Sequence, residues 1–141
     1  MNALKLLVLS KPTPAPHFNQ IILTAPDIDS GVFVRIAKVI RGSAERITLY
    51  ASSHDIALAA SKKKNASYPR AGDCSDSVAV VSGVDTIDAS AVDTNLIGHF
   101  YYAENRSVLS DIFTLLRDGG PPPRFGIRPV EVTPPYWRFA P

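Results

Sequence analysis

The 141-residue sequence contains a single cysteine, Cys74, so a disulfide within the chain is excluded. It also lacks the closely spaced cysteines and histidines that are typical of zinc sites. We therefore expect no bound metal ion, and no motif in the sequence implies an organic cofactor.

The sequence also has little excess of one charge over the other. The formal net charge is only +2, which gives no strong field to attract nucleic acid or an anionic membrane. The longest basic run, Lys62-Lys63-Lys64, has no aromatic residues interleaved with it. We interpret this run as the solvated end of a helix, and we expect no nucleic-acid partner.

Long apolar runs are also missing, and no stretch is long enough to cross a membrane. The first ten residues, Met1 to Ser10, have a short apolar core but no small-residue cleavage pattern, so they make a poor signal peptide. The sequence therefore assigns no compartment, and the cytoplasm is the default expectation.

What the sequence does contain is an alternation of two apolar patterns. Short apolar runs typical of buried strands are followed by apolar residues at helical spacing. The predicted strands are 18–25, 46–51 and 77–82, and the predicted helices are 32–40, 56–64 and 108–116. This order predicts an α/β fold with parallel strands and helical crossovers. We expect one domain over residues 1–120, with the proline-rich tail 121–141 packed on its surface.

Ligands of such sheets bind beyond the carboxyl ends of the strands, and two residues with acid–base chemistry are predicted there. Asp55 follows the second predicted strand, and His99 lies on the long loop, residues 85–106, before the last predicted helix. A buried carboxylate that accepts a hydrogen bond from one imidazole nitrogen fixes the tautomer and stabilises the imidazolium. We therefore predict that Asp55 and His99 form an acid–base pair. The alternative for Asp55 is a carboxylate at a helix N-terminus with Ser53 as the cap, and the alternative for His99 is a loop histidine with a structural hydrogen bond.

Two other chemistries fit parts of the sequence. Asp27 and Asp29 follow an apolar strand in the Asp-x-Asp spacing of phosphotransferases of the haloacid-dehalogenase type, which use an aspartyl nucleophile and magnesium. Pro26 at the strand end disfavours this, and helix capping by Asp29 is the other interpretation. Cys74 lies in Gly72-Asp-Cys74, but it precedes a strand, so a loop thiol is favoured over a nucleophile.

Four segments together resemble an uncharacterised, mostly bacterial branch of the α/β-hydrolases with esterase- or lipase-like sequences. These segments are Ile22-Leu-Thr-Ala-Pro-Asp-Ile-Asp29, Leu49-Tyr-Ala-Ser-Ser-His-Asp55, Tyr68-Pro-Arg-Ala-Gly-Asp73, and Val84-Asp-Thr-Ile-Asp-Ala-Ser90 continuing to Gly98-His99. The resemblance runs from about Phe18 to Trp137 and implies the C-terminal portion of an α/β-hydrolase fold. It also implies that Asp55 is the acid and His99 the base of a Ser-His-Asp triad, whereas His54 departs from the asparagine expected in that family.

The nucleophile of such a triad is absent from the sequence. No two of the eight glycines are four residues apart, so the Gly-x-Ser-x-Gly elbow does not occur. By resemblance, Met1 to Ser10 corresponds to the helix after the elbow. We therefore expect a serine-hydrolase fragment for small acyl or ester substrates, inactive alone. The alternative is a non-catalytic binding module that pairs with a complementing N-terminal chain or a second copy through exposed sheet edges.

Overall fold

The structure is a computed structural model that describes residues 18–54, 68–92 and 106–140, together with Ala3, Leu6, Leu9, Ser10, Leu58 and Ala60. Its elements are β1 (Phe18–Thr24), α2 (Ser30–Ile40), β2 (Ala44–Ala51), β3 (Asp85–Asp88), α5 (Arg106–Asp118), β4 (Ile127–Val130) and β5 (Tyr136–Phe139). Over these described residues, the strands form one sheet in the order β1-β2-β3-β5-β4. The first four of these strands are parallel, and β4 is antiparallel to β5.

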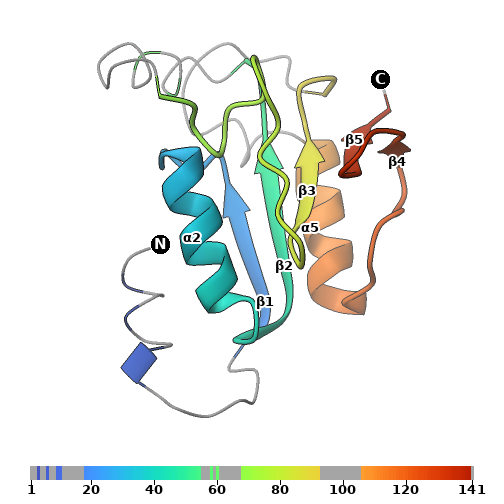
Figure 1. Cartoon of the computed structure of the whole chain (residues 1–141). Coiled ribbons are helices and arrows are strands. Elements are labelled where there is room, and N and C mark those ends of the chain that lie inside the picture. The colour runs from blue at the N-terminus through green and yellow to red at the C-terminus, as the bar shows by residue number, and fades with distance from the viewer. Residues whose placement is uncertain are drawn as a thin grey trace.

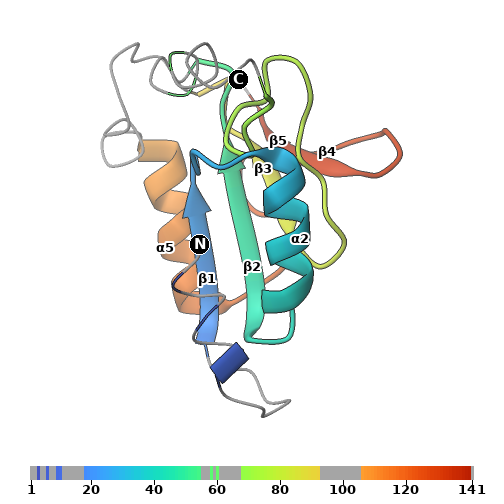
Figure 2. The same ribbon diagram turned by 60° about the vertical axis from the view of Figure 1, so that its left-hand side comes forward.

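The sheet separates two helices, with α2 covering one face and α5 the other (Figures 1 and 2). Because successive side chains of a strand point to opposite faces, β2 contributes to both layers. Leu49 packs in the cluster that contains α2, and Tyr50 packs in the cluster that contains residues of α5. Both side chains are fully buried, as expected for a parallel strand covered on both faces.

Helix α2 begins where Asp29 caps it, since the Asp29 side chain accepts a hydrogen bond from the backbone N of Val32 at 2.9 Å. Its buried positions recur at helical spacing and face β1 and β2: Phe33, Ile36, Ala37 and Ile40. Burying a side chain of the size of Phe33 or Ile40 contributes roughly 1.5–3 kcal/mol. That burial, together with the cap, explains why this segment forms a helix.

Helix α5 packs through Val108 and Leu115 against the opposite face and ends at Asp118, directly before Gly119. Gly119 has a φ of 66°, and its backbone N donates to the carbonyl oxygen of Leu115 at 2.9 Å. A left-handed residue directly after a helix is the usual glycine termination. None of the helices in the described parts of the chain is long and apolar enough to span a membrane.

The prediction of an α/β fold with a mostly parallel sheet is confirmed. The predicted strands 18–25 and 46–51 and the predicted helices 32–40 and 108–116 correspond to β1, β2, α2 and α5, with small differences at the ends. The predicted helix 56–64 lies almost wholly outside the described residues.

The prediction of a third strand at 77–82 is wrong. The third strand is β3, inside the segment expected to be a loop, and it pairs with Thr48–Ala51 of β2. Residues 77–82 instead run irregularly across the α2 face, where the Ala79 carbonyl accepts from the Thr86 hydroxyl at 2.8 Å. A turn at Gly83, with a φ of 84°, then leads the chain into β3. Val81 and Ala79 of this segment pack in the cluster on this face of the sheet, and the segment does not join the sheet as a strand.

The proline-rich tail also differs from the expected surface segment. Residues 127–130 and 136–139 form the hairpin of β4 and β5, and β5 pairs in parallel with β3. The tail therefore extends the sheet itself. Figure 1 shows the hairpin beside β3, on the side away from β1.

Candidate functional site

The candidate site lies where the parallel strands end, at the upper edge of the sheet in Figure 1. The predicted acid Asp55 and the predicted base His99 both lie outside the described residues. The structure describes the chain up to His54 on one side and up to Val92 on the other, and these two segments leave β2 and β3, which are neighbours in the sheet. At this site, the structure therefore describes the two segments that precede Asp55 and His99 in the chain.

Two hydrogen bonds fix the start of the turn after β2. The backbone N of buried Ser52 donates to the carbonyl oxygen of Gly72 at 2.9 Å, and the backbone N of His54 donates to the Ser52 hydroxyl at 3.1 Å. A serine hydroxyl that accepts from the amide two residues later is a common turn device. It directs the chain toward Asp55 while His54 itself stays exposed.

The turn after β3 lies directly beside it. The backbone N of Ala89 donates to the carbonyl oxygen of Ala51 at 2.8 Å, which extends the ladder between the strands. Just beyond this bond, the backbone N of Ser53 donates to the hydroxyl of Ser90 at 2.9 Å. The structure thus brings together the segment just before Asp55 and the segment that leads toward His99.

Asp88 anchors this contact from the end of β3. Its buried carboxylate accepts from the backbone N of Ser90 at 2.9 Å, from the Cys74 thiol at 3.3 Å and from Nε of Arg138 at 3.0 Å. Burial raises the pKa of Asp88, but the hydrogen bonds from Ser90, Cys74 and Arg138 outweigh it and hold that pKa below the ordinary value. Asp88 is therefore a carboxylate at neutral pH.

Sequence reasoning missed Asp88 and Ser90 as site residues. The available signal was the alternation of polar and apolar residues in Asp85-Thr-Ile-Asp88, which is typical of a strand. A strand at that place puts Asp88 and Ser90 at its carboxyl end, where ligands of parallel sheets bind.

Cys74 has no properties of a nucleophile in this structure. Burial raises the pKa of its thiol, a hydrogen bond with Ser90 opposes the shift, and the nearby Asp88 carboxylate adds to it, so that the pKa lies at about 12. A thiol with that pKa is protonated at neutral pH, whereas the reactive form is the thiolate. Its role in the structure is to donate a hydrogen bond to Asp88.

The two aspartates of the Asp-x-Asp pattern are engaged in building the fold. Asp29 caps α2, and Oδ1 of Asp27 faces Nε of Arg70 at 3.3 Å as an ion pair without the alignment of a hydrogen bond. Gly72 packs so closely under this turn that a Cβ there would lie 2.4 Å from the carbonyl carbon of Ala25. Both aspartates therefore make structural contacts, Asp29 at the start of α2 and Asp27 with the loop that carries Arg70.

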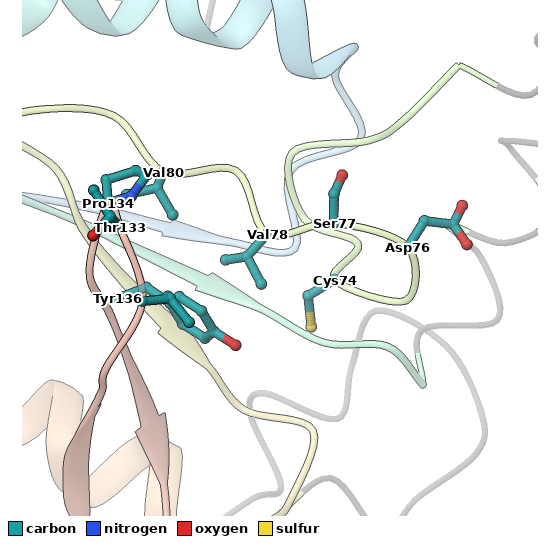
Figure 3. Close-up of a pocket in the computed structure, with 9 residues that line it drawn as sticks. Cys74, Asp76, Ser77, Val78, Val80, Thr133, Pro134 and Tyr136 are labelled. Carbon is teal, nitrogen blue, oxygen red and sulfur yellow. The ribbon is translucent and has the colours of Figure 1, made fainter.

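No group of three or more potential metal ligands is present among the residues that the structure describes. A cavity of about 590 Å³ does lie next to the Asp88 cluster, between residues 74–80 and the tail hairpin. Figure 3 shows Cys74, Val78 and Tyr136 projecting toward this space, while Asp76 points away from it. Its lining combines valines, hydroxyl groups and the Cys74 thiol with one acidic residue, Asp76.

Residues 1–118 match the family model described as alpha/beta hydrolase of unknown function (DUF900). The search of curated proteins and the search of solved structures returned no significant match. The family match spans most of the 141 residues and agrees with the mostly parallel sheet flanked by helices. The chain therefore belongs to this family of alpha/beta hydrolases of unknown function.

Proposed function

We propose that Asp55 and His99 are the acid and base of a Ser-His-Asp triad that hydrolyses ester or related acyl bonds. The observation that carries the proposal is the 2.9 Å hydrogen bond from the Ser53 backbone to the Ser90 hydroxyl. It joins the turn that leads into Asp55 to the turn that starts the connection to His99. Membership of an alpha/beta hydrolase family supports the same chemistry.

In this scheme His99 takes the proton of the serine hydroxyl as the serine oxygen attacks the acyl carbonyl. Asp55 accepts a hydrogen bond from the other ring nitrogen and balances the imidazolium charge. The tetrahedral intermediate collapses when His99 returns the proton to the leaving alcohol. His99 then deprotonates a water molecule, which attacks the acyl-enzyme. As the second tetrahedral intermediate collapses, His99 returns this proton to the serine oxygen, and the carboxylic acid and the free serine are released. The scheme uses no metal or organic cofactor.

The proposal assigns the serine and the oxyanion hole to polypeptide outside these 141 residues, because the sequence holds no Gly-x-Ser-x-Gly. Two described features support a complementing polypeptide. Within the described residues β1 pairs only with β2, so its outer edge offers unpaired backbone groups. Helix α5 also exposes a stripe of large apolar side chains at helical spacing: Leu109, Phe113 and Leu116.

The test is complementation. The chain is co-expressed with the nucleophile-containing portion of a longer member of the same family, and turnover of a short-chain nitrophenyl ester is measured. We expect no turnover by the chain alone, and turnover and fluorophosphonate labelling by the complemented assembly. His99→Ala should abolish turnover of the assembly, whereas the matched variant His54→Ala should not. Strong turnover by the chain alone, or unchanged turnover with His99→Ala, would show that the proposed function is wrong.

A second candidate is a binding module without catalysis. It is favoured by the exposed stripe of α5, since exposed apolar side chains that gather on one face of a helix can mark a protein interface. The same complementation distinguishes the two candidates. A stable assembly that contains the serine yet turns over no ester and takes up no fluorophosphonate would favour the binding module.

A further inference from the structure

The two outer edges of the sheet differ in their capacity to accept a further strand. Among the described residues, β1 and β4 each have a neighbouring strand on one side only. On β4, the backbone N of Ala140 donates to the carbonyl oxygen of Gly126 at 2.8 Å, so these residues form a hydrogen-bonded antiparallel pair. Such pairs alternate along the ladder, which turns the backbone N of Pro129 to the outer edge. Because proline has no N–H, β4 is a poor template for another strand.

The outer edge of β1 has no such block. The backbone N of Ala25 donates to the carbonyl oxygen of Tyr50 at 3.0 Å, and the N–H groups that bond a parallel neighbour alternate along a strand. The backbone groups of Gln20, Ile22 and Thr24 therefore point away from β2. The seven residues of β1 include neither a proline nor a charged side chain, which are common protections of an edge.

Helix α5 turns an apolar stripe to the same side of the molecule. Three large apolar side chains of this helix are exposed: Leu109, Phe113 and Leu116. Around the helix axis, the stripe lies on one flank of the buried face, and Ser107 and Ser110 lie on the other. The two serines line a cavity together with residues of the tail, so the stripe faces the β1 side. At the end of the helix, a Cβ on Gly119 would lie 3.6 Å from Nε2 of Gln20, so β1 is close by.

We propose that the edge of β1 and the apolar stripe of α5 form the contact between two copies of this chain. The copies meet about a two-fold axis perpendicular to the sheet, so that their β1 strands pair antiparallel and the sheet continues across the contact. This axis keeps both α5 helices on the same face of the joined sheet, with their stripes turned toward each other. The contact involves neither of the residues to which the proposed function assigns catalysis.

The edge of β1 is complementary to itself. Its outward residues Gln20, Ile22 and Thr24 are symmetric about Ile22, so an antiparallel pair centred there places Ile22 opposite Ile22 of the second copy. The same register places Gln20 opposite Thr24 of the second copy, and all three residues then form hydrogen-bonded pairs. On the other face of the joined sheet, Ile21 lies opposite Leu23 of the second copy. Polar side chains thus meet polar ones, and apolar side chains meet apolar ones.

The charges of this surface also favour a second copy. A two-fold contact brings identical groups together, so an excess of one charge at its centre would oppose it. β1 has no charged side chain, and Arg117, which lies over the ring of Phe113, is paired with Asp118 at 2.7 Å. Because Pro129 blocks the edge of β4, the assembly closes at two copies instead of growing into a fibre.

The test is sedimentation velocity of the full 141-residue chain over a range of concentrations. We expect a species of twice the 15.2 kDa mass of the chain, which dissociates on dilution. Thr24→Pro removes an outward N–H and should raise the dissociation constant at least about tenfold, whereas the matched variant Thr24→Val keeps the N–H and should still dimerise. Phe113→Lys should also raise it at least about tenfold, and the control Ser110→Lys, on the other flank of α5, should not.

Hydrogen exchange locates the contact without any substitution. The amide hydrogens of Ile22 and Thr24 should exchange at least about tenfold more slowly in the dimer than after dilution, because they gain partners in the second copy. The amide hydrogens of Ile21 and Leu23 bond to β2 in both states, so their exchange should not change.

A chain that stays monomeric at every concentration would overturn the proposal, and so would a dimer that Thr24→Pro and Phe113→Lys leave intact. If Thr24→Pro fails to fold by circular dichroism, Phe113→Lys and the exchange of the wild-type chain decide. Protection of Ile22 and Thr24 only by the nucleophile-containing portion of a longer family member would assign the surface to that polypeptide instead. None of these measurements uses ester turnover, so a failure of the proposed function is seen separately.

Discussion

Arg124 and Asp111 form a buried bidentate ion pair between α5 and the segment that leads to β4. Nε of Arg124 donates to Oδ1 of Asp111 at 2.6 Å, and Nη2 donates to Oδ2 at 2.7 Å. The side chains are 5% and 1% exposed. Tyr50 of β2 donates its hydroxyl to the same carboxylate, and burial together with that bond raises the pKa of Tyr50. One buried cluster therefore connects the sheet, α5 and the tail.

Breaking this pair should destabilise the chain strongly. Arg124→Met leaves the Asp111 carboxylate buried without its cation, and removing one partner of a buried pair costs about 3–5 kcal/mol. Tyr50→Phe removes one hydrogen bond and should cost about 1–2 kcal/mol. The measurement is the free energy of unfolding in urea at pH 7.

Two controls sharpen this prediction. Arg117→Ala breaks the exposed pair with Asp118 and should leave the midpoint of unfolding unchanged. The double variant Arg124→Met/Asp111→Leu should recover part of the stability lost by Arg124→Met, because no uncompensated charge stays buried. A double variant less stable than both single variants would contradict this account of the cluster.

Acid should weaken the contact between the two turns. The pKa of Asp88 is lower in the folded chain than in the unfolded chain, so the folded chain binds fewer protons. The stabilisation by Asp88 is therefore complete above the ordinary aspartate pKa of about 3.9 and is lost as pH falls through the lower folded-state value. Asp88→Asn should be less stable than wild type at pH 7, by about 1–2 kcal/mol, with a difference that shrinks below pH of about 4.

The measurement is urea unfolding of both chains between pH 2 and 7. If the two stability curves run parallel through the acid range, Asp88 does not titrate with a lowered pKa and the proposed anchoring of Ser90 loses its basis. An Asp88→Asn curve that is flatter than the wild-type curve below pH 4 is the expected result.

Cys74 should resist alkylation in the folded chain. With a pKa of about 12 the thiolate fraction at pH 8 is very small, so iodoacetamide should react at least about tenfold more slowly than with the same chain in urea. Cys74→Ser keeps a donor for Asp88 and should fold normally, whereas Cys74→Val should lower stability. Rapid labelling of the native chain would contradict the buried, hydrogen-bonded thiol.

The role of Asp29 as a helix cap leads to a further expectation. Asp29→Ala should lower the free energy of unfolding by about 1 kcal/mol, while Asp29→Asn, which keeps a capping oxygen, should be close to wild type. If the pair with Asp27 served phosphoryl transfer instead, Asp29→Asn would abolish magnesium-dependent hydrolysis of nitrophenyl phosphate. We expect no such hydrolysis from the wild-type chain.

The elements with strong local patterns were predictable from the sequence. The apolar spacing of α2 and the amphipathic pattern of α5 identify both helices, and the apolar runs identify β1 and β2. The third strand was not identified, because Ser77-Val-Ala-Val-Val-Ser82 has the stronger strand composition. The strand that pairs with β2 is Asp85–Asp88, which lies in register with Thr48–Ala51. The valine-rich segment instead contributes Val81 to the cluster on the α2 face of the sheet.

The features that depend on distant partners could not be predicted in this way. Nothing local connects Arg138 to Asp88, or Arg124 to Asp111, since these pairs form only when the tail joins the sheet. Likewise the contact of Ser53 with Ser90 requires the parallel pairing of β2 and β3, which was expected in general but with the wrong third strand. Sequence patterns identify the buried faces of helices and strands, whereas the order and register of the strands determine which loops lie side by side.

The coupling between Asp55 and His99 in the complemented assembly tests the central claim most directly. It is measured as a double-mutant cycle on kcat/KM for a nitrophenyl ester. Each single variant, Asp55→Asn and His99→Ala, should lose about 10³-fold or more, and the double variant should lose no more than His99→Ala alone. Losses that multiply in the double variant would contradict the claim, because they would show that the two residues act independently.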